Sequence, residues 1–220
     1  MDRLSCSFLR LAPLIVLSAL FVTAAGCAAV SHMMYVIKGN EIEAAYDGLE
    51  ESRVAIVCVS DATSYGPDSL THVISRAMGT RLTQQVKDIV VIPQHKIETW
   101  KDANGWDELD YEALGRGVDA GKVVAVEIGS YSIHEGTTLY KGRAMVTTSV
   151  YDLEREGHVV FSQGPAEYQF PKSHGRPAVS TNPQQFEAAY LSMLVDSICR
   201  NFHAYEKTET VAEDATEFAW

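Results

Sequence analysis

The chain has 220 residues, and its 29 acidic residues outnumber its 18 lysines and arginines to give a formal net charge of −11. This length suits one packed domain with short flanking segments. The acidity argues against a nucleic-acid partner, because phosphate recognition needs a basic face. It also argues against membrane attachment through a polybasic patch.

The first 26 residues have the layout of a secretory signal peptide. Arg3 and Arg10 bracket a charged start, an apolar run covers residues 11–22, and small residues then lead to Cys27. The apolar run is shorter than the ~20 residues that a membrane-spanning helix needs. We therefore predict that residues 1–26 are a cleaved signal peptide.

Residues 24–27, Ala-Ala-Gly-Cys, resemble a bacterial lipobox. The resemblance implies cleavage before Cys27 and acylation of its thiol and its new amino group, with palmitate among the acyl chains. Such chains hold firmly, because each buried methylene contributes ~0.8 kcal/mol. Residues 27–40 would then be a lipidated tether at the bacterial cell envelope, in the outer membrane and facing the periplasm. The alternative is an ordinary signal peptide that is cut at a nearby small residue.

Residues 41–205 begin with the periodicities of alternating strands and helices. The continuous β-branched run 53–60 predicts a buried central strand. Gly66-Pro67 predicts a helix start with proline at the first position, and a second short strand is expected at 89–93. The apolar stripe of the helix consists of Leu70, Val73, Ile74, Ala77, Met78, Leu82 and Val86.

The rest of the domain is predicted as an irregular segment 94–109, a weak helix 110–119, three strands, a long loop 169–181 and a final helix. The strands are expected at 122–133, 139–153 and 158–162, with a possible resumption of the third strand near Tyr168. Asn182-Pro183 gives the final helix a strong start, with asparagine as the cap and proline at the first position. Its apolar stripe consists of Phe186, Tyr190, Met193, Leu194, Ile198, Phe202 and Tyr205. Residues 206–220 are predicted to be an acidic mobile tail.

The predicted order is β-α-β-α-β-β-β-α. The alternation of strands and helices at the start indicates parallel strands that are joined by crossover helices, and the later run of strands adds antiparallel neighbours to the sheet. The fold class is therefore α/β (α+β), with a single mixed β-sheet and packed helices.

The lipobox and this element order resemble a group of envelope lipoproteins. The group comprises the curli-secretion lipoproteins, the lipoprotein activators of penicillin-binding proteins and the amino-terminal domain of the Tol-system periplasmic protein. Three stretches carry the resemblance, namely 53–60, 121–131 and 140–153, the last of which contains Val-Tyr-Asp near the end of a long strand. The resemblance implies a non-enzymatic accessory or assembly protein that binds another envelope protein or associates with itself. The chain lacks the second membrane-inserting hairpin of the curli channel and the long linker of the synthase activators.

Two other functions remain as alternatives. The first is a subunit of an oligomeric ring or secretion pore, against which the basic face of Lys141 and Arg143 argues, because basic side chains at mid-bilayer cost ~2–4 kcal/mol each. The second is an envelope hydrolase with an unrecognised site, although the sequence contains no G-x-S-x-G or S-x-x-K motif. Scattered histidines and the absence of a paired Cys-x-x-Cys predict no metal and no cofactor.

Two cysteines, Cys58 and Cys199, lie in the expected domain. In an exported protein they form either a disulfide or two small buried apolar side chains, and the sequence does not choose between these.

Three features are candidates for partner binding, each with a plainer alternative. They are a cationic cluster in the long loop, the tryptophans of the irregular segment, and the aromatic end of the acidic tail. The plainer alternatives are that the loop is simply mobile, that the tryptophans fill the edge of a core, and that the tail is disordered and has no partner. The residues are Lys172, His174 and Arg176; Trp100 and Trp106; and Trp220.

Overall fold

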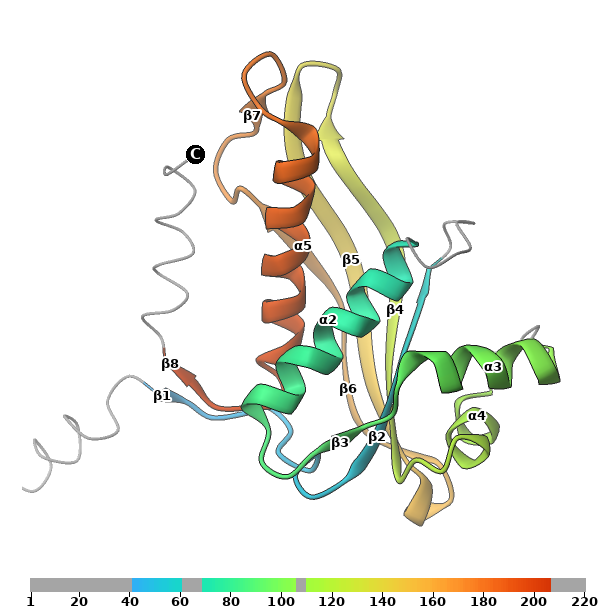
Figure 1. Cartoon of the computed structure of the whole chain (residues 1–220). Coiled ribbons are helices and arrows are strands. Elements are labelled where there is room, and N and C mark those ends of the chain that lie inside the picture. Colours follow the sequence, from blue (N-terminus) through green and yellow to red (C-terminus); the bar gives the residue numbers. More distant parts are fainter. Residues whose placement is uncertain (1–40, 61–68, 106–109, 207–220) are drawn as a thin grey trace, which may run out of the picture. The chain divides into compact units, whose positions relative to one another are not determined.

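The computed structural model describes residues 41–60, 69–105 and 110–206. The chain divides after Glu41, and the unit that follows contains one mixed sheet with helices packed on both of its faces (Figure 1). This architecture confirms the predicted α+β class with a single mixed sheet. Cys27 and Trp220 lie outside the described residues, as do Trp106 and Pro67.

The main sheet has six strands, and five of them follow the order β3-β2-β4-β5-β6. The central strand β2 is parallel to both β3 and β4, whereas β5 is antiparallel to β4 and to β6. A short sixth strand, β7, also pairs with β5. The bounds are β2 Arg53–Ser60, β3 Val90–Val91, β4 Lys122–Glu135, β5 Leu139–Asp152, β6 His158–Phe170 and β7 Arg176–Pro177.

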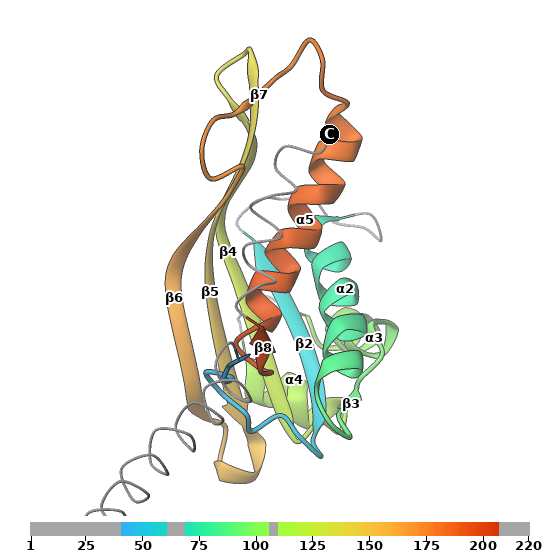
Figure 2. The ribbon, with the colours of Figure 1, turned by 90° about the vertical axis from the view of Figure 1, so that its left-hand side faces the viewer.

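Two long helices, α2 (Leu70–Gln85) and α5 (Pro183–Cys199), cover one face of the sheet (Figure 2). Their apolar stripes and the inward side chains of β2, β4 and β5 form the larger of two cores. Each helix starts at a side-chain cap, because Ser69 and Asn182 each accept a hydrogen bond from a backbone N–H three residues on. The predicted stripe of α5 is confirmed at Phe186, Tyr190, Leu194 and Ile198, which are all buried. The helix ends at Cys199, so the stripe was wrong at Phe202, which is buried beyond the helix, and at Tyr205, which belongs to β8.

Two shorter helices, α3 (Gln94–Asn104) and α4 (Tyr111–Gly117), cover the opposite face of β2 and β4. The prediction of an irregular segment over 94–109 was therefore wrong for the residues up to Asn104. Ile97 is buried in the smaller core and Trp100 packs against it, so one face of α3 is held by packing. Gly105 has φ 68° at the C-cap of α3, a conformation that glycine adopts readily, and it ends this helix.

Other predicted boundaries differ by a few residues. Helix α2 begins at Leu70, and Val73 leaves the buried stripe, being 37% exposed. The second strand is reduced to two residues between the buried Ile89 and Ile92. Strand β6 continues past Ser162 to Phe170 and so takes the first part of the predicted loop. The remaining elements are β1 Glu41–Ile42, the 3-10 turn η1 Leu153–Arg155 and β8 Tyr205–Glu206.

Candidate functional site

A concave feature lies at the amino-terminal end of α5, and we call it the α5 pocket. It has a volume of about 330 Å³. Phe170 and Phe186 form an apolar floor, with ring centroids 5.9 Å apart, and polar side chains surround the mouth. The lining residues are Phe170, Arg176, Pro177, Ser180, Thr181, Asn182, Gln185, Phe186 and Ala189.

Strand β7 determines how Arg176 reaches this pocket. After Phe170 the chain leaves the sheet for five residues and returns at β7, where Arg176 pairs with Tyr140 of β5. Residues paired across a ladder point to the same face of the sheet. Arg176 therefore lies on the face that α5 covers, where the Tyr140 ring contacts Phe186 at a centroid distance of 5.5 Å.

Two sources of positive charge lie at the pocket mouth. Arg176 contributes a full charge, and the amino-terminal end of α5 contributes the positive end of the helix dipole. Asn182 Oδ1 accepts from the backbone N–H of Gln185 at 3.1 Å, which satisfies one of the free amides of the first turn. No acidic side chain stands in that first turn or among the residues that line the pocket in the described part of the chain.

The other two members of the predicted cationic cluster lie outside the pocket lining. Lys172 and His174 are exposed on residues 171–175, the excursion between β6 and β7. The carbonyl of Ser173 in this excursion accepts a hydrogen bond from Lys141 Nζ at 3.2 Å. The structure therefore brings Arg176 alone of the three into the pocket.

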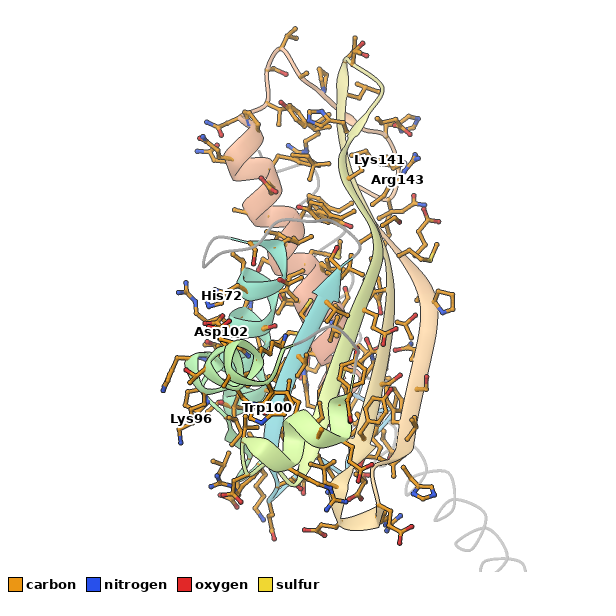
Figure 3. The ribbon with its side chains drawn as sticks, turned by 90° about the vertical axis from the view of Figure 1, so that its right-hand side faces the viewer. His72, Lys96, Trp100, Asp102, Lys141 and Arg143 are labelled. Atoms are coloured by element: carbon orange, nitrogen blue, oxygen red, sulfur yellow. The ribbon has the colours of Figure 1, made fainter. Side chains whose placement is uncertain are left out.

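The prediction of a basic face on β5, formed by Lys141 and Arg143, is correct for only one of the two residues. Lys141 is 7% exposed, because residues 171–175 fold over its side chain. Arg143 is exposed and forms an ion pair with Glu135 of the β4–β5 hairpin. Figure 3 shows both side chains toward the hairpin end of the sheet, away from α3.

Trp100 fills the edge of the smaller core. It is half-buried on α3, and its indole lies so close to Gly117 of α4 that a Cβ there would approach Nε1 to 1.9 Å. His72 Nε2 lies 3.2 Å from Glu98 Oε1 and joins α2 to α3 beside it. Figure 3 shows the labelled Trp100, His72, Lys96 and Asp102 gathered around α3. This packing favours the core-edge alternative for Trp100.

Two hydrogen-bonded tyrosine–glutamate pairs were not predicted from the sequence. Tyr111 donates to Glu127 Oε1 at 2.9 Å, and Tyr131 donates to Glu187 Oε1 at 3.1 Å. Burial is the main cause that raises the pKa of both phenols, and the neighbouring carboxylates raise it further. Each pair connects a strand to a helix, so both serve to hold the two helical layers on the sheet.

Cys58 on β2 and Cys199 on α5 are both buried in the larger core, and both thiols are free in the structure. Burial raises the pKa of each thiol to about 12. A raised folded-state pKa favours the neutral thiol, so this contribution to stability is complete below the unfolded pKa of about 8.5 and is lost as the pH rises toward 12.

We expect both thiols to be unreactive in the folded protein, because the nucleophile is the thiolate and burial suppresses it. Iodoacetamide at pH 8 should leave the peptides of Cys58 and Cys199 unlabelled in native protein and label both in denaturant without reductant. Mass spectrometry of the two peptides is the measurement. A disulfide would instead protect both peptides in denaturant until a reductant is added.

In the parts of the chain that the structure describes, no three metal-binding side chains come together. Within the same residues, no helix combines the length and the apolar character that crossing a bilayer requires.

No protein-family model matches the sequence, and no curated protein is similar to it in sequence. Lipoprotein GNA1162 from Neisseria meningitidis is 14% identical, over 67% of this chain and 97% of its own, with a TM-score of 0.44. The PelC dodecamer from Paraburkholderia phytofirmans is 12% identical, over 74% of this chain and 95% of its own, at 0.42. The LpoB C-terminal domain from Salmonella enterica is 12% identical, over 64% of this chain and 90% of its own, with a TM-score of 0.36. The specific lipoprotein group expected from the sequence stays a prediction.

Proposed function

We propose that this protein is a lipid-anchored accessory or assembly protein of the bacterial envelope that acts by contact with another protein and not by catalysis. The observation that carries the proposal is the α5 pocket, with its floor of Phe170 and Phe186 and the two sources of positive charge at its mouth. An apolar floor with a few placed polar groups is typical of a binding site. Arg176 supplies the charge at its mouth.

The rim of the pocket adds a second feature of a docking surface. Val179 lies between the pocket residues Pro177 and Ser180 and is 98% exposed. The buried core of a protein interface is more apolar than the rest of the surface, and arginine is enriched there. An exposed apolar side chain beside a pocket and an arginine is compatible with such a surface. Lys172 and His174, exposed on the neighbouring excursion, would extend the contact at its edge.

Anchoring through Cys27 belongs to the same proposal. Its support is the lipobox-like stretch 24–27 together with the signal-peptide layout before it. Attachment to the outer membrane, facing the periplasm, would present the domain to other envelope proteins.

Cys27→Ser should abolish labelling by a fatty-acid probe and release the protein from membranes, because serine has no thiol to acylate. Labelling and fractionation of the envelope measure both effects, with Cys58→Ser as the matched control that keeps Cys27. Labelling that persists in Cys27→Ser would refute the lipid anchor.

Protein contact is tested by photo-crosslinking from the rim of the pocket in living cells. A photoreactive amino acid at Val179 should give discrete adducts with an envelope protein, whereas the same residue at Val90 should give few. Val90 is a suitable control because it is also an exposed valine, 50% accessible, on the edge strand β3. Adducts with a second copy of this chain would indicate self-association. Equal patterns from both positions would contradict docking at the α5 pocket.

A further inference from the structure

The residues that line the α5 pocket indicate the chemistry of the ligand that it would bind. Its floor of Phe170, Phe186 and Ala189 requires an apolar or aromatic group. Its mouth, with Arg176 and the amino-terminal end of α5, requires a negative charge close to that group. A peptide that carries an aromatic side chain among carboxylates satisfies both requirements.

This chain itself contains such a peptide. Residues 209–220 read Glu-Thr-Val-Ala-Glu-Asp-Ala-Thr-Glu-Phe-Ala-Trp. Four carboxylates and no basic residue occur in this segment, and Glu217 lies directly beside Phe218. The segment therefore complements both the floor and the mouth of the pocket.

The length of the chain permits docking within one molecule. Helix α5 has 17 residues, so its two ends are about 25 Å apart at a rise of 1.5 Å per residue. The segment begins just beyond β8, which follows the carboxyl-terminal end of α5. Residues 207–218, at ~3.3 Å each, reach at most ~40 Å, which exceeds the length of the helix.

We infer that residues 209–220 are an intramolecular ligand of the α5 pocket, with Phe218 or Trp220 on the aromatic floor and the neighbouring carboxylates at Arg176. The inference rests on the proposed function, since it specifies the chemistry that the docking site recognises. A partner protein then competes with the chain's own segment, and its binding sequence carries an aromatic residue among acidic ones.

The test uses the full chain in membranes with p-benzoylphenylalanine in place of Phe218. Illumination should crosslink this position to a peptide that contains pocket residues, within one molecule, so that the product migrates as a monomer. The yield should fall in 1 M salt, because the Debye length shortens to about 3 Å. Crosslinks to another part of the domain, or crosslinks found only in dimers, would overturn the inference.

Charge variants identify the pocket as the site. Arg176→Glu should lower the yield about fivefold, the change that corresponds to one exposed ion pair, whereas Lys96→Glu should leave it nearly unchanged. Lys96 is a suitable control, since it is an exposed cation on α3, which covers the opposite face of the sheet. Glu217→Lys should lower the yield equally without a change among the residues that line the pocket, and combining it with Arg176→Glu should restore the yield. If the crosslinking yield changes in neither Arg176→Glu nor Glu217→Lys, the assignment of the pocket as the docking site is refuted.

Different experimental outcomes refute the intramolecular docking of residues 209–220 and the proposed function. Absence of partner adducts from Val179 in cells would contradict docking of a partner but would leave the Phe218 crosslink intact. Conversely, partner adducts from Val179 without the Phe218 crosslink would retain the docking surface and remove its internal ligand.

Discussion

Replacing Leu194 by alanine should lower the free energy of unfolding by about 2–5 kcal/mol, because it removes buried methyl groups and leaves a cavity. Leu194 has no exposed surface and lies in the middle of α5, within the larger core. The helix owes most of its stability to burying this face. Chemical denaturation gives the free energies.

Gln184→Ala is the matched control for this change. Gln184 is exposed in the first turn of the same helix, so its replacement should be nearly neutral. Equal denaturation midpoints for the two variants would mean that α5 is not docked on the sheet in solution.

Gly142→Ala should destabilise the domain by about 1–3 kcal/mol through overpacking. Gly142 on β5 lies directly beneath the ring of Tyr190, and an added Cβ would meet the ring atoms at 2.4–2.6 Å. These are the ring atoms nearest the backbone, so the side chain cannot move aside without moving α5. The ring is also held by a hydrogen bond of 3.1 Å from its hydroxyl to the carbonyl of Tyr168.

Gly129→Ala provides the comparison within the same sheet. Gly129 lies on the neighbouring strand β4, and nothing comes within 4 Å of a Cβ at this position. Thermal unfolding of both variants should therefore show a lowered midpoint for Gly142→Ala alone. A similar loss in both would attribute the effect to strand glycines in general and not to the contact with Tyr190.

The best-predicted elements are those whose local signals and burial agree. The run 53–60 is rich in β-branched residues, and its residues 54–58 are all buried, as expected for a parallel strand that is covered on both faces. Helix α5 combines an asparagine cap, a proline at the first position and a regular apolar stripe. In both elements every local preference agrees with the global fold.

The elements that were missed, such as α3, or predicted too short, such as β6, have local signals that conflict with their tertiary surroundings. Helix α3 has few apolar positions, and it is stable because Trp100 packs against α4, a contact between separate segments. Strand β6 contains Gly164 and Pro165, which interrupt its pattern at a register shift against β5. A sequence read one segment at a time cannot supply these contacts.

The candidate site was predicted only in part for the same reason. Composition drew attention to Arg176, because it belongs to the small cationic cluster of an acidic chain. Phe170 was assigned to the long loop 169–181 and Phe186 to the final helix, and nothing in the sequence indicated that their rings meet. The pocket exists because the chain returns through β7 and crosses to α5, and such a path is a property of the fold.

The position of β2 has a consequence for how the chain matures. Its register with β4 runs from Val54–Lys122 to Ser60–Ile128, whereas β3 offers it only two paired residues. Its main partner is therefore separated from it by α2, β3, α3 and α4. A chain that emerges amino end first thus exposes a very apolar strand until β4 has followed, and non-local pairing of this kind is slow and prone to aggregation. We therefore expect that shielding of residues 53–60 during this interval raises the yield of folded protein.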